Sequence, residues 1–217
     1  MRAMRRLLEA GHSLIVIEHN LDVMRASDWL IDLGPEGGEA GGMLVAEGSP
    51  EDMRQHPTSH TGRALREYAQ AMGEALGVGE FDPVTLQRLS ASTHPTTRAR
   101  NSASQVHDAL HAAPPEAIRI LNAKEHNLKN LSVDVPRGKF NVITGVSGSG
   151  KSTLAFDILF NEGQRRYLES LNAYARSIVQ PAGRPEVDAV YGIPPTVAIE
   201  QRLSRGGRKS TVGTTTE

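Results

Sequence analysis

A run of glycine, serine and lysine carries the clearest chemical signal in the sequence. Residues 145–152 read GVSGSGKS and fill every fixed position of the phosphate-loop template G-x-x-x-x-G-K-[ST]. The glycines permit backbone conformations in which consecutive N–H groups turn inward around phosphate oxygens. Lys151 supplies a mobile ammonium for the outer phosphates, and Ser152 supplies a hydroxyl for Mg²⁺. The residues predicted to bind nucleotide are Gly145, Val146, Ser147, Gly148, Ser149, Gly150, Lys151, Ser152 and Thr153.

The segments on either side of this run have the character that a phosphate loop requires. Residues 140–144 form a short apolar run with β-branched side chains, which predicts a buried strand, and residues 152–160 have a helical pattern. A helix at this point directs the positive end of its dipole at a bound phosphate. A glycine-rich connector without a ligand is the alternative, and the complete template with both flanks argues against it. We therefore expect ATP and Mg²⁺ as ligands.

Composition limits the function classes without choosing a partner. The chain has 217 residues, 24 Lys and Arg against 25 Asp and Glu, and no cysteine. The near balance of charge predicts no global basic field for nucleic acid, so any such surface is local. The absence of cysteine excludes disulfides and cysteine-ligated zinc, and it suits the cytoplasm. No apolar run approaches the roughly 18 residues of a membrane span, so no membrane association is expected.

Residues 1–72 alternate between strand and helix patterns. Expected strands cover 13–17, 29–33 and 43–46, and expected helices cover 21–26, the segment that begins at Ser49-Pro50, and 61–72. Paired glycines at 37–38 and 41–42 mark turns. This order is typical of the closing part of an α/β domain.

Residues 73–116 are expected to form an exposed linker, because their central part is rich in Ser, Thr and Arg and lacks large apolar side chains. A second unit then occupies residues 117–217. Expected strands cover 118–123, 131–135, 140–144 and 196–200, a hairpin-type turn covers 136–139, and helices cover 152–160 and 164–179. The predicted fold class is therefore α/β, with partial domains joined by a flexible linker.

Several motifs together resemble the UvrA family, the DNA-damage-recognition ATPases of the excinuclease ABC system. The segments VIEHNLDV at 16–23 and DWLIDLGPEGG at 28–38 resemble the closing part of that family. The segments EHNLKN at 125–130, GQRRY at 163–167, AYAR at 173–176 and IEQ at 199–201, together with the phosphate loop, resemble its opening part. The likeness covers everything except the linker.

The resemblance implies a P-loop NTPase of the ABC type that works in nucleotide excision repair. Its Walker A loop corresponds to residues 145–152, its histidine switch to His19, and its metal- and water-linked glutamine to Gln201. His19 and Gln201 are therefore the expected catalytic residues, and Ser152 and Gln201 the expected metal contacts. The implied partners are DNA, other excinuclease proteins such as a UvrB-like protein, and a second copy of the parent protein.

The departures from the family pattern predict a fragment. The signature loop, the Walker B aspartate and the zinc-binding cysteine clusters have no counterpart here, and His19 precedes Lys151, which inverts the order in an ABC domain. We therefore expect His19 to close one nucleotide-binding domain and Lys151 to open the next, as in a tandem fusion of UvrA-like units. A circularly permuted single domain is the rival explanation. The fragment is expected to bind ATP weakly and not to hydrolyse it alone.

Other functions are also consistent with these residues. The ATPase component of an ABC transporter shares the loop, the glutamine and the histidine, and a nucleotide-gated interaction module would use ATP only as a ligand. The basic residues between 202 and 209 either grip DNA phosphates or form a solvated loop. The histidine pairs 56/60 and 107/111 have helical spacing but lack a third ligand, so solvated side chains are favoured over a metal site.

Overall fold

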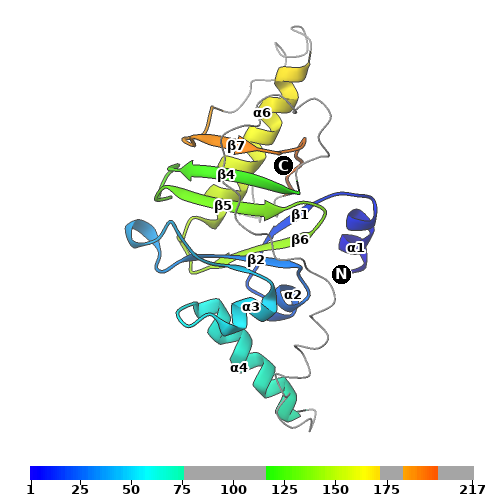
Figure 1. Ribbon diagram of the computed structural model, residues 1–217, viewed down its shortest axis with the longest axis vertical. Helices are drawn as coiled ribbons and strands as arrows, with labels where there is room; N and C mark the ends of the chain where they lie inside the picture. The colour runs from blue at the N-terminus through cyan, green and yellow to red at the C-terminus, as the bar shows by residue number, and fades with distance from the viewer. Residues whose placement is uncertain (76–115, 172–182, 200–217) are drawn as a thin grey trace, which may run out of the picture.

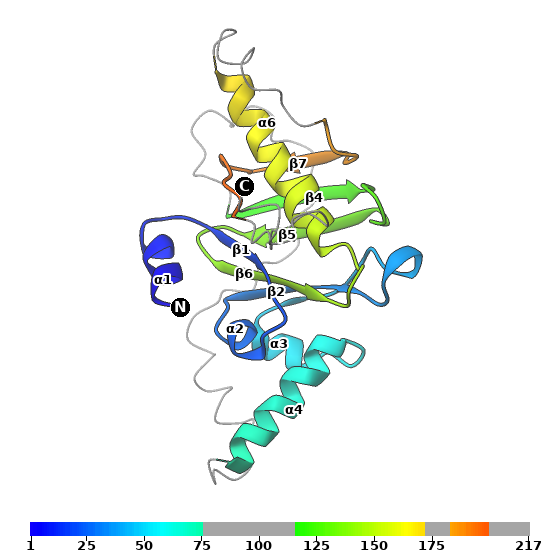
Figure 2. The same cartoon turned by 180° about the vertical axis from the view of Figure 1, so that it is seen from behind.

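The computed structural model describes residues 1–75, 116–171 and 183–199, which form three layers (Figures 1 and 2). A four-stranded sheet lies in the middle. Helices α2 (Leu21–Arg25), α3 (Pro50–Gln55) and α4 (His60–Ala75) lie below it in Figure 1, and a three-stranded sheet with helix α6 (Asn161–Ser170) lies above it. The phosphate loop belongs to the middle layer.

The four-stranded sheet contains strands from both segments of the chain. Its order is β1-β6-β2-β3, where β1 is Leu14–Ile17, β2 is Trp29–Gly34, β3 is Met43–Gly48 and β6 is Phe140–Gly145. Strand β6 pairs in parallel with both β1 and β2, whereas β2 and β3 are antiparallel. The strand that feeds the phosphate loop thus lies between two strands that precede it by more than 100 residues.

Apolar residues on both faces explain why β6 and β2 occupy the centre of this sheet. Ile143 and Ile31 point into a core shared with the three-stranded sheet, whereas Val142 and Leu30 point into a second core beneath the helices. All four side chains are completely buried. A parallel strand covered on both faces is expected to be continuously apolar in this way.

The helices of the lower layer begin at side-chain caps that the sequence provides. Asn20 accepts hydrogen bonds from the backbone N–H groups of Asp22 and Val23 at the start of α2. Ser49 and Asp52 form a reciprocal capping box at the start of α3, with Pro50 at its first position. Each such cap stabilises a helix by about 1 kcal/mol. These helices bury Met24, Met53 and Leu65 against the middle sheet.

The three-stranded sheet is antiparallel and has the order β5-β4-β7, where β4 is Ala117–Ala123, β5 is Leu131–Pro136 and β7 is Ala189–Tyr191. Alternate residues of β4 and β5 are buried, including Ile118, Ile120, Val133 and Val135. They pack with Leu154 and Ile158 of the helix that follows the phosphate loop. Figure 2 shows that helix crossing in front of this sheet.

Three sequence predictions are corrected by the structure. The turn at 136–139 does not make a hairpin, because β5 and β6 enter different sheets. The described part of the expected strand 196–200 has no strand pairing; instead Thr196 Oγ1 donates to Phe160 O at 2.9 Å. The helices expected at 152–160 and 164–179 are continuous through Ser170, as η2 (Thr153–Phe160) and then α6. Residues 172–179 lie outside the described residues.

The α/β class is confirmed. The two segments are not structurally separate, however. Strands from within 1–72 and 117–217 share one sheet in this chain, so the two expected partial domains meet in a single α/β unit. Their assignment to successive domains of a longer parent stays a prediction. Most of the expected linker, residues 76–115, lies outside the described residues.

Candidate nucleotide site

Three parallel strands end together at the edge of the middle sheet where the phosphate loop begins. The register pairs Ile17 of β1 with Ile143 of β6, and Leu33 of β2 with Gly145. His19 follows β1 by two residues, as Gly145 follows Ile143, so the histidine and the loop start at the same level. The carboxyl edge of parallel strands is where α/β folds bind ligands.

The phosphate loop has the backbone that its glycines predict. Gly145, Gly148 and Gly150 have φ values of 129°, 76° and 98°, in the region that favours glycine. A Cβ atom on Gly145 would also lie 1.9 Å from the Leu33 carbonyl oxygen, so this position leaves no room for a side chain. The expectation that these three glycines permit the loop conformation is therefore confirmed.

Lys151 lies at the base of the loop with its side chain largely buried. Its Nζ donates to the carbonyl oxygens of Gly145 at 2.9 Å and Val146 at 2.6 Å. Burial lowers the pKa of Lys151, and the negative charge of Asp32 opposes that shift. The N–H of Ser149 also donates to Val146 O, at 3.2 Å. The loop's ammonium and one of its amides thus converge on a single carbonyl oxygen.

A buried hydroxyl cluster surrounds Asp32 beneath the loop. Asp32 accepts from Ser59 Oγ at 2.6 Å and from Thr61 Oγ1 at 3.0 Å. Thr61 Oγ1 is also 3.2 Å from Thr144 Oγ1, on the strand residue just before the loop. Asp32 is only 3% exposed and lies at the N-terminus of α4, where a negative charge is favourable. The cluster therefore anchors α4 to the strand that ends in the phosphate loop.

A cavity of about 270 Å³ opens beside the loop. Its wall includes His19 from the first segment and Gly145 and Val146 from the second, with Asp32 and His60 nearby. The structure thus brings His19 to the same cavity as the start of the phosphate loop. The sequence order predicts that His19 and Lys151 serve different nucleotides, and which nucleotide each contacts stays a prediction. The strand pairing between the segments places His19 and the loop at the same end of one sheet.

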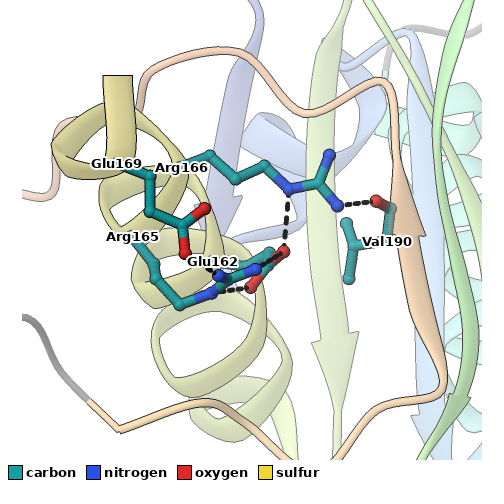
Figure 3. Close-up of polar contacts among 5 residues, drawn as sticks. All are labelled: Glu162, Arg165, Arg166, Glu169 and Val190. Carbon is teal, nitrogen blue, oxygen red and sulfur yellow. Dashed lines mark hydrogen bonds and ion pairs between the residues drawn. The ribbon is translucent and has the colours of Figure 1, made fainter. Parts of the chain in front are cut away.

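The helix after the loop is fixed to the upper sheet by a buried carboxylate (Figure 3). Glu162 accepts from Arg165 Nε and Nη2, both at 2.8 Å, and from Arg166 Nε at 2.8 Å. Arg166 also donates to the carbonyl oxygen of Val190 in β7. Burial acts to raise the pKa of Glu162, but the hydrogen bonds and charges of the two arginines outweigh it and lower that pKa. This network holds the phosphate-loop helix against the sheet.

The structure describes some of the remaining predicted site residues and not others. Ser152 is exposed and Thr153 is buried at the start of the helix. Gln201, the basic residues between 202 and 209, and the pair His107 and His111 lie outside the described residues. His56 follows α3 and His60 begins α4, so these two histidines do not share one helix face.

Sequence reasoning did not find two side chains that contact the site. Asp32 is a lone carboxylate in an otherwise apolar strand, and that pattern is a signal for a buried polar role. Asn127 Nδ2 donates to Gly148 O at 2.7 Å, inside the EHNLKN motif, but no spacing rule connects that motif to the loop. Both contacts depend on long-range packing.

Within the described ranges 1–75, 116–171 and 183–199, no group of three or more His, Cys, Asp or Glu side chains is arranged to hold a metal ion. In the same ranges, no helix combines the length and the apolar character needed to cross a membrane.

Comparison with known proteins finds sequence relatives that share one name. No family model matches the chain. "UvrABC system protein A" of Neisseria meningitidis is 52% identical over 111 residues, which cover 51% of this chain and 12% of that protein. The Thermus thermophilus protein of the same name is 56% identical over 102 residues, which cover 47% of this chain and 11% of that protein.

A solved structure carries the same family name. UvrA2 from Deinococcus radiodurans aligns with 55% sequence identity and a TM-score of 0.35, over 38% of this chain and 10% of that one. The identity to the curated relatives confirms the resemblance drawn from the motifs, although the chain spans only about an eighth of the length of the relatives that it matches. About half of this chain therefore matches a fragment of these UvrA proteins in sequence.

Proposed function

We propose that the chain binds ATP with Mg²⁺ at residues 145–153. The observation that carries the proposal is the loop itself, with three glycines at positive φ around the buried ammonium of Lys151. A phosphate oxygen can replace the carbonyl oxygens of Gly145 and Val146 as the acceptor for Lys151. The strand before the loop and the helix after it supply the remaining parts of an anion site.

The donor set fits a nucleotide with its metal. Backbone N–H groups and a lysine favour phosphate, and the exposed hydroxyl of Ser152 is the kind of hard oxygen that Mg²⁺ prefers. We propose Ser152 as a contact of the metal, with Gln201 as a second contact from the sequence alone. Bound Mg²⁺ would neutralise charge on the phosphates.

His19 is proposed to face the outer phosphates of the same nucleotide. The register of β1 and β6 and the shared cavity support this role. An imidazole there could donate a hydrogen bond to a phosphate oxygen as charge develops. Turnover by the chain alone is not expected, because no Walker B carboxylate is recognisable and Asp32 already accepts from two hydroxyls. Phosphate release by purified chain that disappears in Lys151→Ala would overturn this expectation.

The wider role is proposed from the family. We propose that the parent protein is a UvrA-like ATPase of nucleotide excision repair that acts on DNA with other excinuclease proteins in the cytoplasm, as a homodimer. The name of the relatives and the identity over about half of this chain support the proposal. Stimulation of the parent ATPase by damaged DNA would support it, and indifference to DNA would count against it.

Nucleotide binding is tested by titrating the full chain with a fluorescent ATP analogue and Mg²⁺. Lys151→Ala should weaken binding at least about tenfold, because it removes a charge-assisted contact. Lys139→Ala is the matched control, since Lys139 is an exposed lysine at the other end of β6. Equal affinities for Lys151→Ala and Lys139→Ala would contradict the proposed site.

A further inference from the structure

A second glycine-rich segment, from the other part of the chain, lies against the outer side of the phosphate loop. We call residues 37–42 the glycine strap. The N–H of Gly38 in the strap donates to Gly148 O at 3.0 Å. The side-chain amide of Asn127 joins both segments, because its Nδ2 is 2.7 Å from Gly148 O and 3.3 Å from Gly38 O. Two donors therefore hold the carbonyl group of Gly148.

The strap approaches the loop more closely than side chains would allow. Gly37 has an ordinary φ of −94°, so its backbone does not need glycine. A Cβ at this position would nevertheless lie 2.3 Å from the carbonyl oxygen of Ser147. A Cβ on Gly42 would lie 1.8 Å from the carbonyl oxygen of Asn127. These glycines are explained by contact with the loop and with the residue that clamps it.

Fixing the Gly148 carbonyl also fixes an amide that faces the phosphate site. In a trans peptide, the N–H of Ser149 points away from the carbonyl of Gly148, because the two groups share one plane. The carbonyl points outward to Asn127 and Gly38, so the N–H points to the inner side of the loop. There it donates to Val146 O at 3.2 Å, the same oxygen that accepts from Lys151.

We infer that Asn127 is a positioning residue for the phosphate loop, acting together with the glycine strap. It holds the Gly148 peptide in the orientation that presents the Ser149 N–H to a phosphate oxygen. The link to phosphate rests on the proposed function. The clamp, by which we mean the hydrogen bonds from Asn127 and Gly38 to Gly148 O, follows from the contacts alone. The inference joins two motifs, GPEGG and EHNLKN, to the site.

The test measures hydrogen exchange of the full chain without nucleotide. Asn127→Ala should accelerate exchange of the amides at 146–151 about tenfold, because it removes the hydrogen bond to Gly148 and the one that ties Asn127 to the strap. Asn122→Ala is the matched control: Asn122 donates to Asp188 Oδ2 at 2.7 Å, away from the loop, within the same upper layer. It should leave exchange of the loop unchanged while lowering overall stability.

A second variant keeps Asn127 and disturbs the strap. Gly37→Ala places a methyl group against the Ser147 carbonyl and should accelerate exchange of the same loop amides. Unchanged loop exchange in both Asn127→Ala and Gly37→Ala would overturn the inference. Equal acceleration in Asn122→Ala would also overturn it, because the effect would then reflect general destabilisation.

Nucleotide titration of the same variants separates this inference from the proposed function. Asn127→Ala should raise the dissociation constant for the ATP analogue about fivefold, with a smaller effect for Asn122→Ala. If the wild-type chain binds no nucleotide while Asn127→Ala still loosens the loop, the proposed function fails and the clamp stands. If nucleotide binds equally to all variants, the role of Asn127 toward phosphate is overturned.

Discussion

The two sides of the phosphate loop contact different kinds of chemical group. On the outer side, the glycine strap and Asn127 contact the loop through neutral backbone and amide groups. The backbones are so close there that the strap glycines leave no room for a Cβ atom. On the inner side, Asp32 and His19 line the cavity, and Lys151 donates to the carbonyl oxygens of Gly145 and Val146, which also line it. The outer side is thus suited to holding a backbone conformation, and the inner side to meeting a charged ligand.

This difference predicts how each side responds to change. Variants on the outer side should act through steric fit and should respond little to pH or salt. Variants among the charged groups should respond to pH, because their ionisation depends on burial and on neighbouring charges. We expect the largest effect at a strap glycine and smaller effects at buried and then exposed carboxylates.

The largest effect is expected for Gly42→Ala. Gly42 has a φ of 79° and no space for a Cβ, whereas Gly11 has a φ of 86° and nothing within 4 Å. Gly11→Ala should lower the free energy of unfolding by about 1 kcal/mol from backbone strain, and Gly42→Ala by about 3 kcal/mol or more. Urea denaturation followed by circular dichroism measures both. Equal losses in the two variants would mean that the close contact of the strap at Gly42 adds nothing to the cost of the substitution.

Asp32→Asn should lower the free energy of unfolding by about 2 kcal/mol, because two buried hydroxyls lose a charged acceptor. The same change should lower the pKa of Lys151 further, since the charge of Asp32 acts to raise it. Nucleotide affinity of the variant should then fall at a lower pH than in the wild type. Identical pH profiles would show that Asp32 does not act on the lysine.

Glu162 should make folding sensitive to acid. Its pKa is lowered in the folded chain, so its stabilisation is present above the ordinary carboxyl range and is lost as pH falls through the folded value. Glu162→Gln should lower stability by about 2 kcal/mol at neutral pH, because Arg165 and Arg166 lose the charge of a buried partner. Its stability should also fall less steeply than that of the wild type between neutral and acidic pH. Parallel curves would contradict this role.

The smallest effect is expected for Glu47→Gln on β3. Burial raises the pKa of Glu47, and the nearby charge of Asp134 raises it further. The charged form therefore opposes folding as pH rises through that pKa. Because the carboxylate is only partly covered and solvent screens its charge, the variant should gain only about 0.3 kcal/mol at neutral pH. A loss of stability in the same denaturation assay would reverse the expected sign.

The sequence predicts local structure correctly where the residues that determine it are close together in the chain. The glycines and lysine of the loop, the apolar strand before it and the caps of α2 and α3 act within a few residues of one another. The strand expected at 196–200 was wrong for the opposite reason. Val197 is 90% exposed, and nearby Thr196 is held by the carbonyl of Phe160, so an apolar pattern there reflects no sheet.

The arrangement of the site could not be predicted in the same way. Pairing of β6 with β1 and β2 joins residues more than 100 positions apart, and no local propensity encodes it. The hairpin expected at 136–139 failed because the strand after the turn finds better partners in the other segment. The contact between Asn127 and Gly38 likewise joins the two segments.

Nucleotide-dependent hydrogen exchange of the full chain tests most directly that two segments build one site. Saturating ATP with Mg²⁺ should protect amides at 146–153 and, with the same midpoint, amides at 18–20 and 34–42 of the first segment. Lys151→Ala should abolish both effects together. Protection confined to 146–153, or two different midpoints, would contradict a shared site and would favour separate nucleotides for His19 and Lys151.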